Sequence, residues 1–181
     1  GDADEPEYKF RTWQIPCSSH DTKYTLLTYY DNLVEDLSKA GVALEWEGVA
    51  ENGEPLDTPY EPIFCAAFKA LTDWARYGIP APHADPIKTR MTFESTDKTM
   101  ALVANQKDAF GNALGGIRHP AADCPTATYQ SYTDHADGES IQMMFGTAKP
   151  LPKEVLKGLY GSLVEYRRLV AQSTDEAISK G

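Results

Sequence analysis

The chain has 181 residues, of which 41% are hydrophobic and 24% are charged, which is ordinary for a globular protein with one hydrophobic core. Its 17 Lys and Arg against 27 Asp and Glu give a formal net charge of −10, which argues against nucleic acid and anionic membranes as partners. No apolar run approaches the length of a membrane-spanning helix.

The first eight residues are acidic and polar and contain proline, which is typical of an exposed loop open to proteolysis. Large apolar and polar residues then alternate over Lys9–Ile15, and this pattern predicts a half-buried strand. Pro16 to Ser19 turn the chain, and His20 and Asp21 follow at once.

From its position alone His20 could be an ordinary solvated loop histidine. It is also the candidate catalytic residue, because a histidine in a loop just past a strand suits a general base held on a sheet edge. Such a base needs a nucleophile to activate and an acid to orient it. The expected strand lies close to the first residue, so we expect both groups to come from an upstream segment outside these 181 residues.

Apolar residues at helical spacing predict a helix over Tyr24–Ala40, ended by Gly41. Residues 42–60 are predicted to be irregular. The clearest helix is predicted over Pro59–Gly78, with an apolar stripe formed by Ile63, Phe64, Ala67, Phe68, Leu71, Trp74 and Ala75.

Further along the chain, residues 100–103 and 113–117 flank a turn at 108–112 and predict a hairpin. Residues 118–150 are predicted to be irregular, and Pro152–Lys180 is predicted to be one long amphipathic helix. One strand cannot cover a helix as apolar as 59–78. Its sheet must therefore come from outside the chain or from strands that the pattern does not reveal.

The three cysteines, Cys17, Cys65 and Cys124, form no C-x-x-C pair, so neither a zinc site nor a redox site is expected, and no cofactor is predicted. Their number leaves their pairing state and the cellular compartment open. Cys17 and the Ser18-Ser19 pair are alternative nucleophiles near His20, but a small buried cysteine is the simpler interpretation. Asp21 is interpreted as a turn residue.

Several other polar residues allow a functional and a structural interpretation. Arg118 could bind a substrate carboxylate or satisfy carbonyls and an acid near the hairpin. The Asp134-His135-Ala136-Asp137 run offers one nitrogen ligand, so a solvated loop is preferred to a metal site. His83 and His119 lie in loop-like sequence. Three glycines near the hairpin lack phosphate-binding spacing and suit turns: Gly111, Gly115 and Gly116.

Four segments together resemble a large bacterial and fungal α/β-hydrolase-domain family, in the order in which that family has them. The first, Trp13–Asp21, is similar to a strand and histidine loop that commonly reads Gly-Thr-Ala-His-Ala-Asp. The others are Pro62–Pro82, Asp108–Asn112 with Gly115–Pro120, and Pro125-x-Ala127-x-Tyr129. Two departures are Cys17, where the family often has glycine, and Asp21-Thr22 in place of Ala-Asp.

The resemblance implies an α/β fold, namely the C-terminal part of an α/β-hydrolase: the last strand, the histidine loop and the sheet-covering helix. Residues 9–82 would belong to this core, and residues 83–181 would form a C-terminal extension with a hairpin and a long helix. The family's Ser–acid–His triad maps here only at His20, because the chain contains no G-x-S-x-G motif.

The resemblance thus implies the C-terminal chain of a serine hydrolase that cleaves a small carboxylic ester or related acyl bond. Its partner would be a companion chain, the upstream segment that carries the serine and the acid. The alternative hypothesis is a non-catalytic interaction subunit that keeps a hydrolase-like scaffold.

Overall fold

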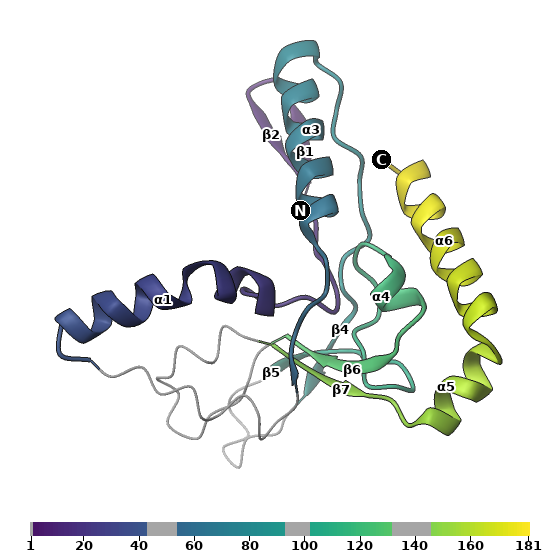
Figure 1. Cartoon of the computed structure of the whole chain (residues 1–181). Helices are drawn as coiled ribbons and strands as arrows, with labels where there is room; N and C mark the ends of the chain where they lie inside the picture. The colour runs from purple at the N-terminus through teal and green to yellow at the C-terminus, as the bar shows by residue number, and fades with distance from the viewer. Residues whose placement is uncertain (1, 43–53, 93–101, 132–145) are drawn as a thin grey trace. The chain divides into compact units, whose positions relative to one another are not determined.

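The computed structural model describes residues 2–42, 54–92, 102–131 and 146–181, and Figure 1 shows their helices and strands. They divide into two compact units. The first unit comprises Gly1–Pro16, Pro59–Pro125 and Lys153–Gly181, and the second comprises Cys17–Thr58 and Thr126–Pro152. The domain limits expected at residues 8 and 82 stay predictions.

The first unit begins with a short antiparallel hairpin of β1 (Ala3–Glu5) and β2 (Tyr8–Phe10). The strand predicted over Lys9–Ile15 is therefore wrong in its extent, because it ends at Phe10. Tyr8 and Phe10 are both exposed, and their rings stack at a centroid distance of 6.2 Å. The alternation of apolar and polar residues here does not mark a buried strand face.

Residues 11–15 are held by separate hydrogen bonds instead of a strand ladder. Arg11 Nε donates to the carbonyl oxygen of Ala81 (2.7 Å). The amide of Ile117 donates to the carbonyl oxygen of Gln14 (2.8 Å). This segment is fixed by individual side-chain and backbone hydrogen bonds. Its alternation of apolar and polar residues resembles that of a strand, so the sequence pattern alone cannot distinguish the two cases.

Helix α3 (Glu61–Tyr77) confirms the helix predicted over 59–78. Pro62 lies in its first turn, where a missing amide hydrogen costs no hydrogen bond. Gly78 ends the helix with a φ of 69°, a left-handed conformation that favours glycine.

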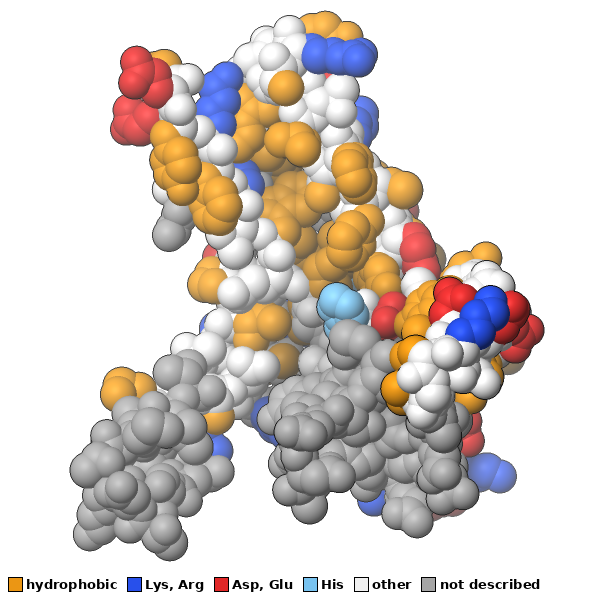
Figure 2. All heavy atoms as spheres, turned by 90° about the vertical axis from the view of Figure 1, so that its left-hand side faces the viewer, with side chains coloured by type: hydrophobic (Ala, Val, Ile, Leu, Met, Phe, Trp, Pro, Cys, Tyr) orange, Lys and Arg blue, Asp and Glu red, His pale blue; other side chains and the backbone are white. Residues whose placement is uncertain are grey.

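The two sides of α3 differ sharply in burial. Trp74 is buried, and the guanidinium of Arg11 lies 4.7 Å from the centre of its ring. Phe64, Phe68 and Leu71 expose 51%, 68% and 60% of their surface. Figure 2 shows hydrophobic side chains spread over the face that carries α3 and the β1–β2 hairpin. Within the described residues, the part of the apolar stripe formed by Phe64, Phe68 and Leu71 stays largely uncovered.

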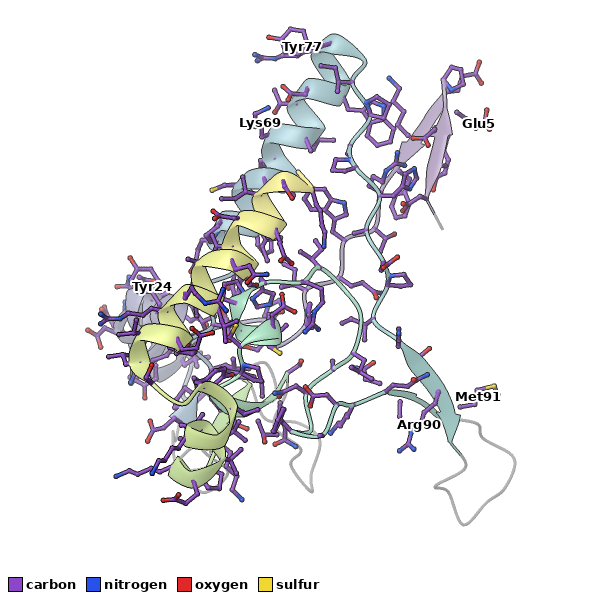
Figure 3. All side chains as sticks on the ribbon, turned by 90° about the vertical axis from the view of Figure 1, so that its right-hand side faces the viewer. Glu5, Tyr24, Lys69, Tyr77, Arg90 and Met91 are labelled. Atoms are coloured by element: carbon purple, nitrogen blue, oxygen red, sulfur yellow. The ribbon has the colours of Figure 1, made fainter. Side chains whose placement is uncertain are left out.

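A second antiparallel pair in the first unit joins β4 (Thr89–Thr92) to β5 (Leu102–Asn105). The hairpin expected from residues 100–117 is therefore wrong in its pairing, because β5 pairs with the preceding strand. Arg90 and Met91, neighbours on β4, extend from the strand in different directions (Figure 3).

The turn predicted at residues 108–112 is confirmed. The amide of Asp108 donates to the carbonyl oxygen of Asn112 (2.8 Å), and the amide of Asn112 donates to a carboxylate oxygen of Asp108 (2.8 Å). An isolated antiparallel bridge between Lys107 and Ala113 closes it. The Asp108 carboxylate accepts hydrogen bonds from backbone amides inside the turn, as is usual for aspartate in turns.

The single helix predicted over Pro152–Lys180 is wrong, because the chain forms α5 (Lys153–Tyr160) and α6 (Leu163–Ser179). Gly161 has a φ of 65°, which interrupts the helical backbone. Ser162 then caps α6 by accepting a hydrogen bond from the amide three residues on. A glycine followed by a serine thus ends one helix and starts another.

The segment 118–150, predicted to be irregular, contains regular structure. In the first unit it forms the single turn α4 (Pro120–Asp123), which lies beside α6 (Figure 1). In the second unit it forms β6 (Ala127–Gln130) and β7 (Thr147–Pro150), in a sheet of order β3-β7-β6. These strands are too short to produce a clear sequence period.

The second unit also contains β3 (Glu54–Pro55) and α1 (Lys23–Lys39), which confirms the helix predicted over 24–40. Thr22 caps α1 reciprocally with Thr25: each side chain accepts a hydrogen bond from the other residue's amide. The left-handed Gly41 follows its end.

Few large apolar side chains are fully buried in the described residues. Leu56 is 1% exposed in the second unit, and Trp74 is 6% exposed in the first. Most other buried hydrophobic residues are small, namely Cys17, Ala81, Ala122, Cys124 and Ala127. The described part of the chain therefore has little apolar core for its length.

Candidate functional site

The loop that carries His20 begins with the predicted turn at Pro16 and Cys17, and both residues are buried. Cys17 has a φ of 58°, the only non-glycine residue with positive φ in the described residues. This conformation costs glycine nothing and strains other residues. Glycine would therefore suit this position, and the cysteine adopts the same turn at a cost in strain.

His20 does not follow a strand directly, since β2 ends at Phe10. The loop is instead fixed from its two sides by other parts of the second unit. On one side, a Cβ atom on Gly146 would lie 2.9 Å from Cβ of Ser19 and would collide with the Gln130 carbonyl and the Leu56 side chain. The start of β7 therefore packs tightly against the residue before His20.

On the other side of His20, Thr22 is 2% exposed and caps α1. The amide of Lys23 donates to the carbonyl oxygen of Leu56 (2.8 Å). The amide of Leu56 in turn donates to the carbonyl oxygen of Gly146 (2.9 Å). Both flanks of the loop are thus connected to the same buried residue, Leu56.

His20 itself is exposed, and within the described residues no side chain or backbone group forms a hydrogen bond with its imidazole. Its neighbour Asp21 is bonded at two points. The hydroxyl of Tyr29 donates to Asp21 Oδ2 (2.5 Å), and Ser19 Oγ donates to the Asp21 carbonyl oxygen. The loop therefore presents an exposed imidazole, without a hydrogen bond in the described residues, between two residues that are hydrogen-bonded.

The contact between Asp21 and Tyr29 is not visible in the sequence pattern. Asp21 lies before the helix cap, so helical spacing does not place it on a face with Tyr29. Tyrosine at this position is explained equally well by core packing. The contact forms because the loop before α1 brings the Asp21 carboxylate close to the Tyr29 hydroxyl, which the sequence pattern does not show.

The alternative nucleophiles near His20 gain no support from the geometry. Cys17 is 3% exposed, so its thiol is shielded from any substrate that approaches the loop. The hydroxyl of Ser19 is engaged with the Asp21 carbonyl. The three cysteines are all thiols, and burial raises the pKa of the Cys124 thiol. These groups are better explained as structural.

Arg118 has a structural role in the first unit. Its Nε donates to Asp123 Oδ1 (2.7 Å), and its Nη2 donates to the Ala122 carbonyl oxygen. Ser173 Oγ, on α6, donates to the other carboxylate oxygen of Asp123 (2.8 Å). The guanidinium is therefore occupied by α4, as the structural interpretation of Arg118 expected.

The glycines near the turn allow close backbone approach. A Cβ atom on Gly115 would collide with the carbonyl of Pro86, and one on Gly116 would lie 2.8 Å from the carbonyl oxygen of Gln14. Both glycines have positive φ. Packing and backbone conformation account for them without a phosphate ligand.

The remaining histidines occupy different environments. His83 is exposed, with Nδ1 2.6 Å from Asp2 Oδ2. His119 is 6% exposed, and its Nε2 donates to the carbonyl oxygen of Pro16 (2.8 Å). Burial lowers the pKa of His119, against a smaller opposing effect of that hydrogen bond. His135 and its neighbouring aspartates lie outside the described residues.

Within the described ranges, no group of three or more His, Cys, Asp or Glu side chains is arranged to hold a metal ion. None of the helices in those ranges combines the length and apolar character needed to cross a bilayer.

A family model described as an alpha/beta hydrolase domain matches residues 1–181. The chain therefore belongs to the alpha/beta hydrolase domain family, which confirms the family suggested by the sequence resemblance and indicates a hydrolase-type function. The mixture of helices and small antiparallel sheets is compatible with an α/β class. No curated protein and no solved structure matches the chain.

Proposed function

We propose that this chain is the C-terminal part of a serine hydrolase and supplies His20 as the general base. The serine nucleophile and the orienting acid would be carried by an upstream segment, present as a companion chain. The substrate would be a small carboxylic ester or a related acyl compound, and no cofactor is needed for this chemistry.

The observation that carries this proposal is the state of His20. Its imidazole is exposed and unbonded within the described residues, while Ser19 and Asp21 on either side are restrained. His20 therefore does not stabilise the loop through hydrogen bonds of its own within the described residues. A general base instead needs one nitrogen directed at a reacting proton, which this environment allows.

The proposed reaction follows the serine hydrolase sequence. The neutral imidazole of His20 takes the serine hydroxyl proton as the serine oxygen forms a bond to the ester carbonyl carbon. The imidazolium then returns the proton to the alcohol oxygen as the C–O bond breaks, which leaves an acyl-enzyme. In the second half, the same imidazole takes a proton from water as the water oxygen bonds to the acyl carbon. It returns that proton to the serine oxygen as the acyl–serine C–O bond breaks, which releases the acid.

The apolar stripe of α3 supports the need for a companion segment. Phe64, Phe68 and Leu71 are each more than half exposed, and burying one such side chain contributes about 1.5–3 kcal/mol. A sheet face is a surface that an amphipathic helix covers in α/β proteins. We therefore propose this stripe as the surface that meets the upstream segment.

The experiment is the His20→Ala substitution in the assembled enzyme. Hydrolysis of p-nitrophenyl butyrate should fall by about 10³-fold or more, because the base acts in the transition state. Folding should change little, since an exposed imidazole contributes little to packing. His83→Ala is the matched control, because His83 is also exposed, and it should keep the parental rate.

A second measurement separates the two hypotheses. A fluorophosphonate probe should label the companion chain in the parental complex, and labelling should be much slower with His20→Ala. Stable assembly without any labelling or ester hydrolysis would contradict the enzyme proposal and favour the non-catalytic interaction subunit.

A further inference from the structure

We infer that Tyr29 is a positioning residue for His20 and acts through Asp21. This inference rests on the proposed function of His20, and it adds a residue that the sequence did not identify. The hydroxyl of Tyr29 donates to Asp21 Oδ2 at 2.5 Å, the separation of a short, charge-assisted hydrogen bond.

The backbone around His20 is closed by a second bond. Ser19 Oγ donates to the carbonyl oxygen of Asp21, so a hydrogen bond connects the residue before His20 to the residue after it. His20 thus lies between two residues, Ser19 and Asp21, that are hydrogen-bonded to each other. A displacement of Asp21 would move His20 with it, because no bond of the imidazole itself opposes the movement within the described residues.

Tyr29 provides the rigid end of this arrangement. It lies within α1, whose start is fixed by the Thr22–Thr25 capping box and by the hydrogen bond from Lys23 to Leu56. Its ring is half-buried, and its hydroxyl reaches back to the loop before the helix. Because α1 is fixed at its start, its bond from Tyr29 to Asp21 restrains the loop that carries the base.

The bond could instead contribute only to stability. The two roles differ in what they do to catalysis. A stabilising contact would change the melting temperature and leave the turnover of the folded enzyme intact. A positioning contact lowers kcat at constant folded concentration and leaves KM nearly unchanged, because the ester is still bound while the base is misplaced.

The test compares four variants with the parental assembled enzyme, using p-nitrophenyl butyrate. Tyr29→Phe and Asp21→Ala remove the hydrogen bond and should each lower kcat about 10-fold with KM within about twofold of the parental value. Asp21→Asn keeps an acceptor oxygen for the Tyr29 hydroxyl and should restore kcat to within about twofold. Tyr24→Phe, on the same helix with an exposed side chain, is the control.

Double substitution gives a further check. Tyr29→Phe combined with Asp21→Ala should reduce kcat no more than either single change, because both remove the same bond. Two independent single changes keep the test valid if one variant folds poorly. His20→Ala is measured in parallel.

The outcomes distinguish the two proposals. Full activity of His20→Ala would overturn the proposed function together with this inference. An inactive His20→Ala with a Tyr29→Phe variant as active as Tyr24→Phe would overturn the positioning role alone. Asp21→Asn as impaired as Asp21→Ala would also overturn it, because the charge of Asp21 and not its bond to Tyr29 would then matter.

Discussion

The imidazole of His119 donates a hydrogen bond to the carbonyl oxygen of Pro16 at 2.8 Å, across 103 positions of the chain. His119 precedes α4, and Pro16 begins the turn that leads to His20. Pro16 is buried and lies outside any strand, so its carbonyl oxygen has no partner in a sheet. The bond from His119 supplies one. It fixes Pro16 to the residue before α4, and both residues belong to the first unit.

This environment predicts a pH dependence of stability. Burial lowers the pKa of His119, so the folded protein binds fewer protons than the unfolded chain just below the ordinary histidine pKa of about 6.5. The contribution of His119 is complete above that pH and is lost progressively as the pH falls toward the lowered value. Urea unfolding of the proposed assembly between pH 7.5 and pH 5 should therefore show decreasing stability.

His119→Gln tests the assignment of that pH dependence, since glutamine keeps a donor but cannot titrate. Its unfolding free energy should vary less over the same pH range than that of the parent. An equal slope in His119→Gln and the parent would contradict the prediction.

A pair of glycine substitutions tests how tightly the histidine loop is packed. Gly146→Ala should destabilise the protein by about 1–3 kcal/mol, because its Cβ would collide with the Gln130 carbonyl and Leu56. Gly158→Ala, inside α5 with nothing within 4 Å of the added Cβ, should stabilise it by about 0.5–1 kcal/mol. Denaturant midpoints measure both, and equal shifts would argue against the close contact at Gly146.

The exposed stripe of α3 predicts that the chain is unstable without a companion. Residues 1–181 alone should bind an apolar dye and unfold without a cooperative transition. Phe68→Asp should reduce dye binding by the isolated chain and weaken its assembly with the companion chain. Val164→Asp, on the exposed side of α6, serves as the control and should leave assembly intact. A sharp thermal transition from the monomer would contradict this expectation.

Asp123 connects two elements of the first unit. It accepts hydrogen bonds from Arg118 and from Ser173 on α6, and Ser173 is 6% exposed. Asp123→Ala should destabilise the protein by about 1–3 kcal/mol, because it leaves the buried Ser173 hydroxyl without its acceptor. Thr174→Ala, at the exposed neighbour, should cost less than about 0.5 kcal/mol. Thermal unfolding compares the two variants.

The sequence by itself determined the elements with strong local signals. The helices at 24–40 and 59–78 follow from apolar spacing and from Gly41 and Gly78 at their ends. The turn at 108–112 follows from Asp108 and its glycine. The family and the choice of His20 as candidate base also came from residues read in order, although its catalytic role stays a prediction.

Only the tertiary structure decided which segments pair and which polar groups meet. The pairing of β4 with β5 and of β7 with β6 joins segments whose short runs carry no register information. The bonds from Tyr29 to Asp21 and from His119 to Pro16 depend on how loops enter their helices and turns. A periodic pattern reports which face of an element is apolar, whereas such contacts depend on the position of one backbone relative to another.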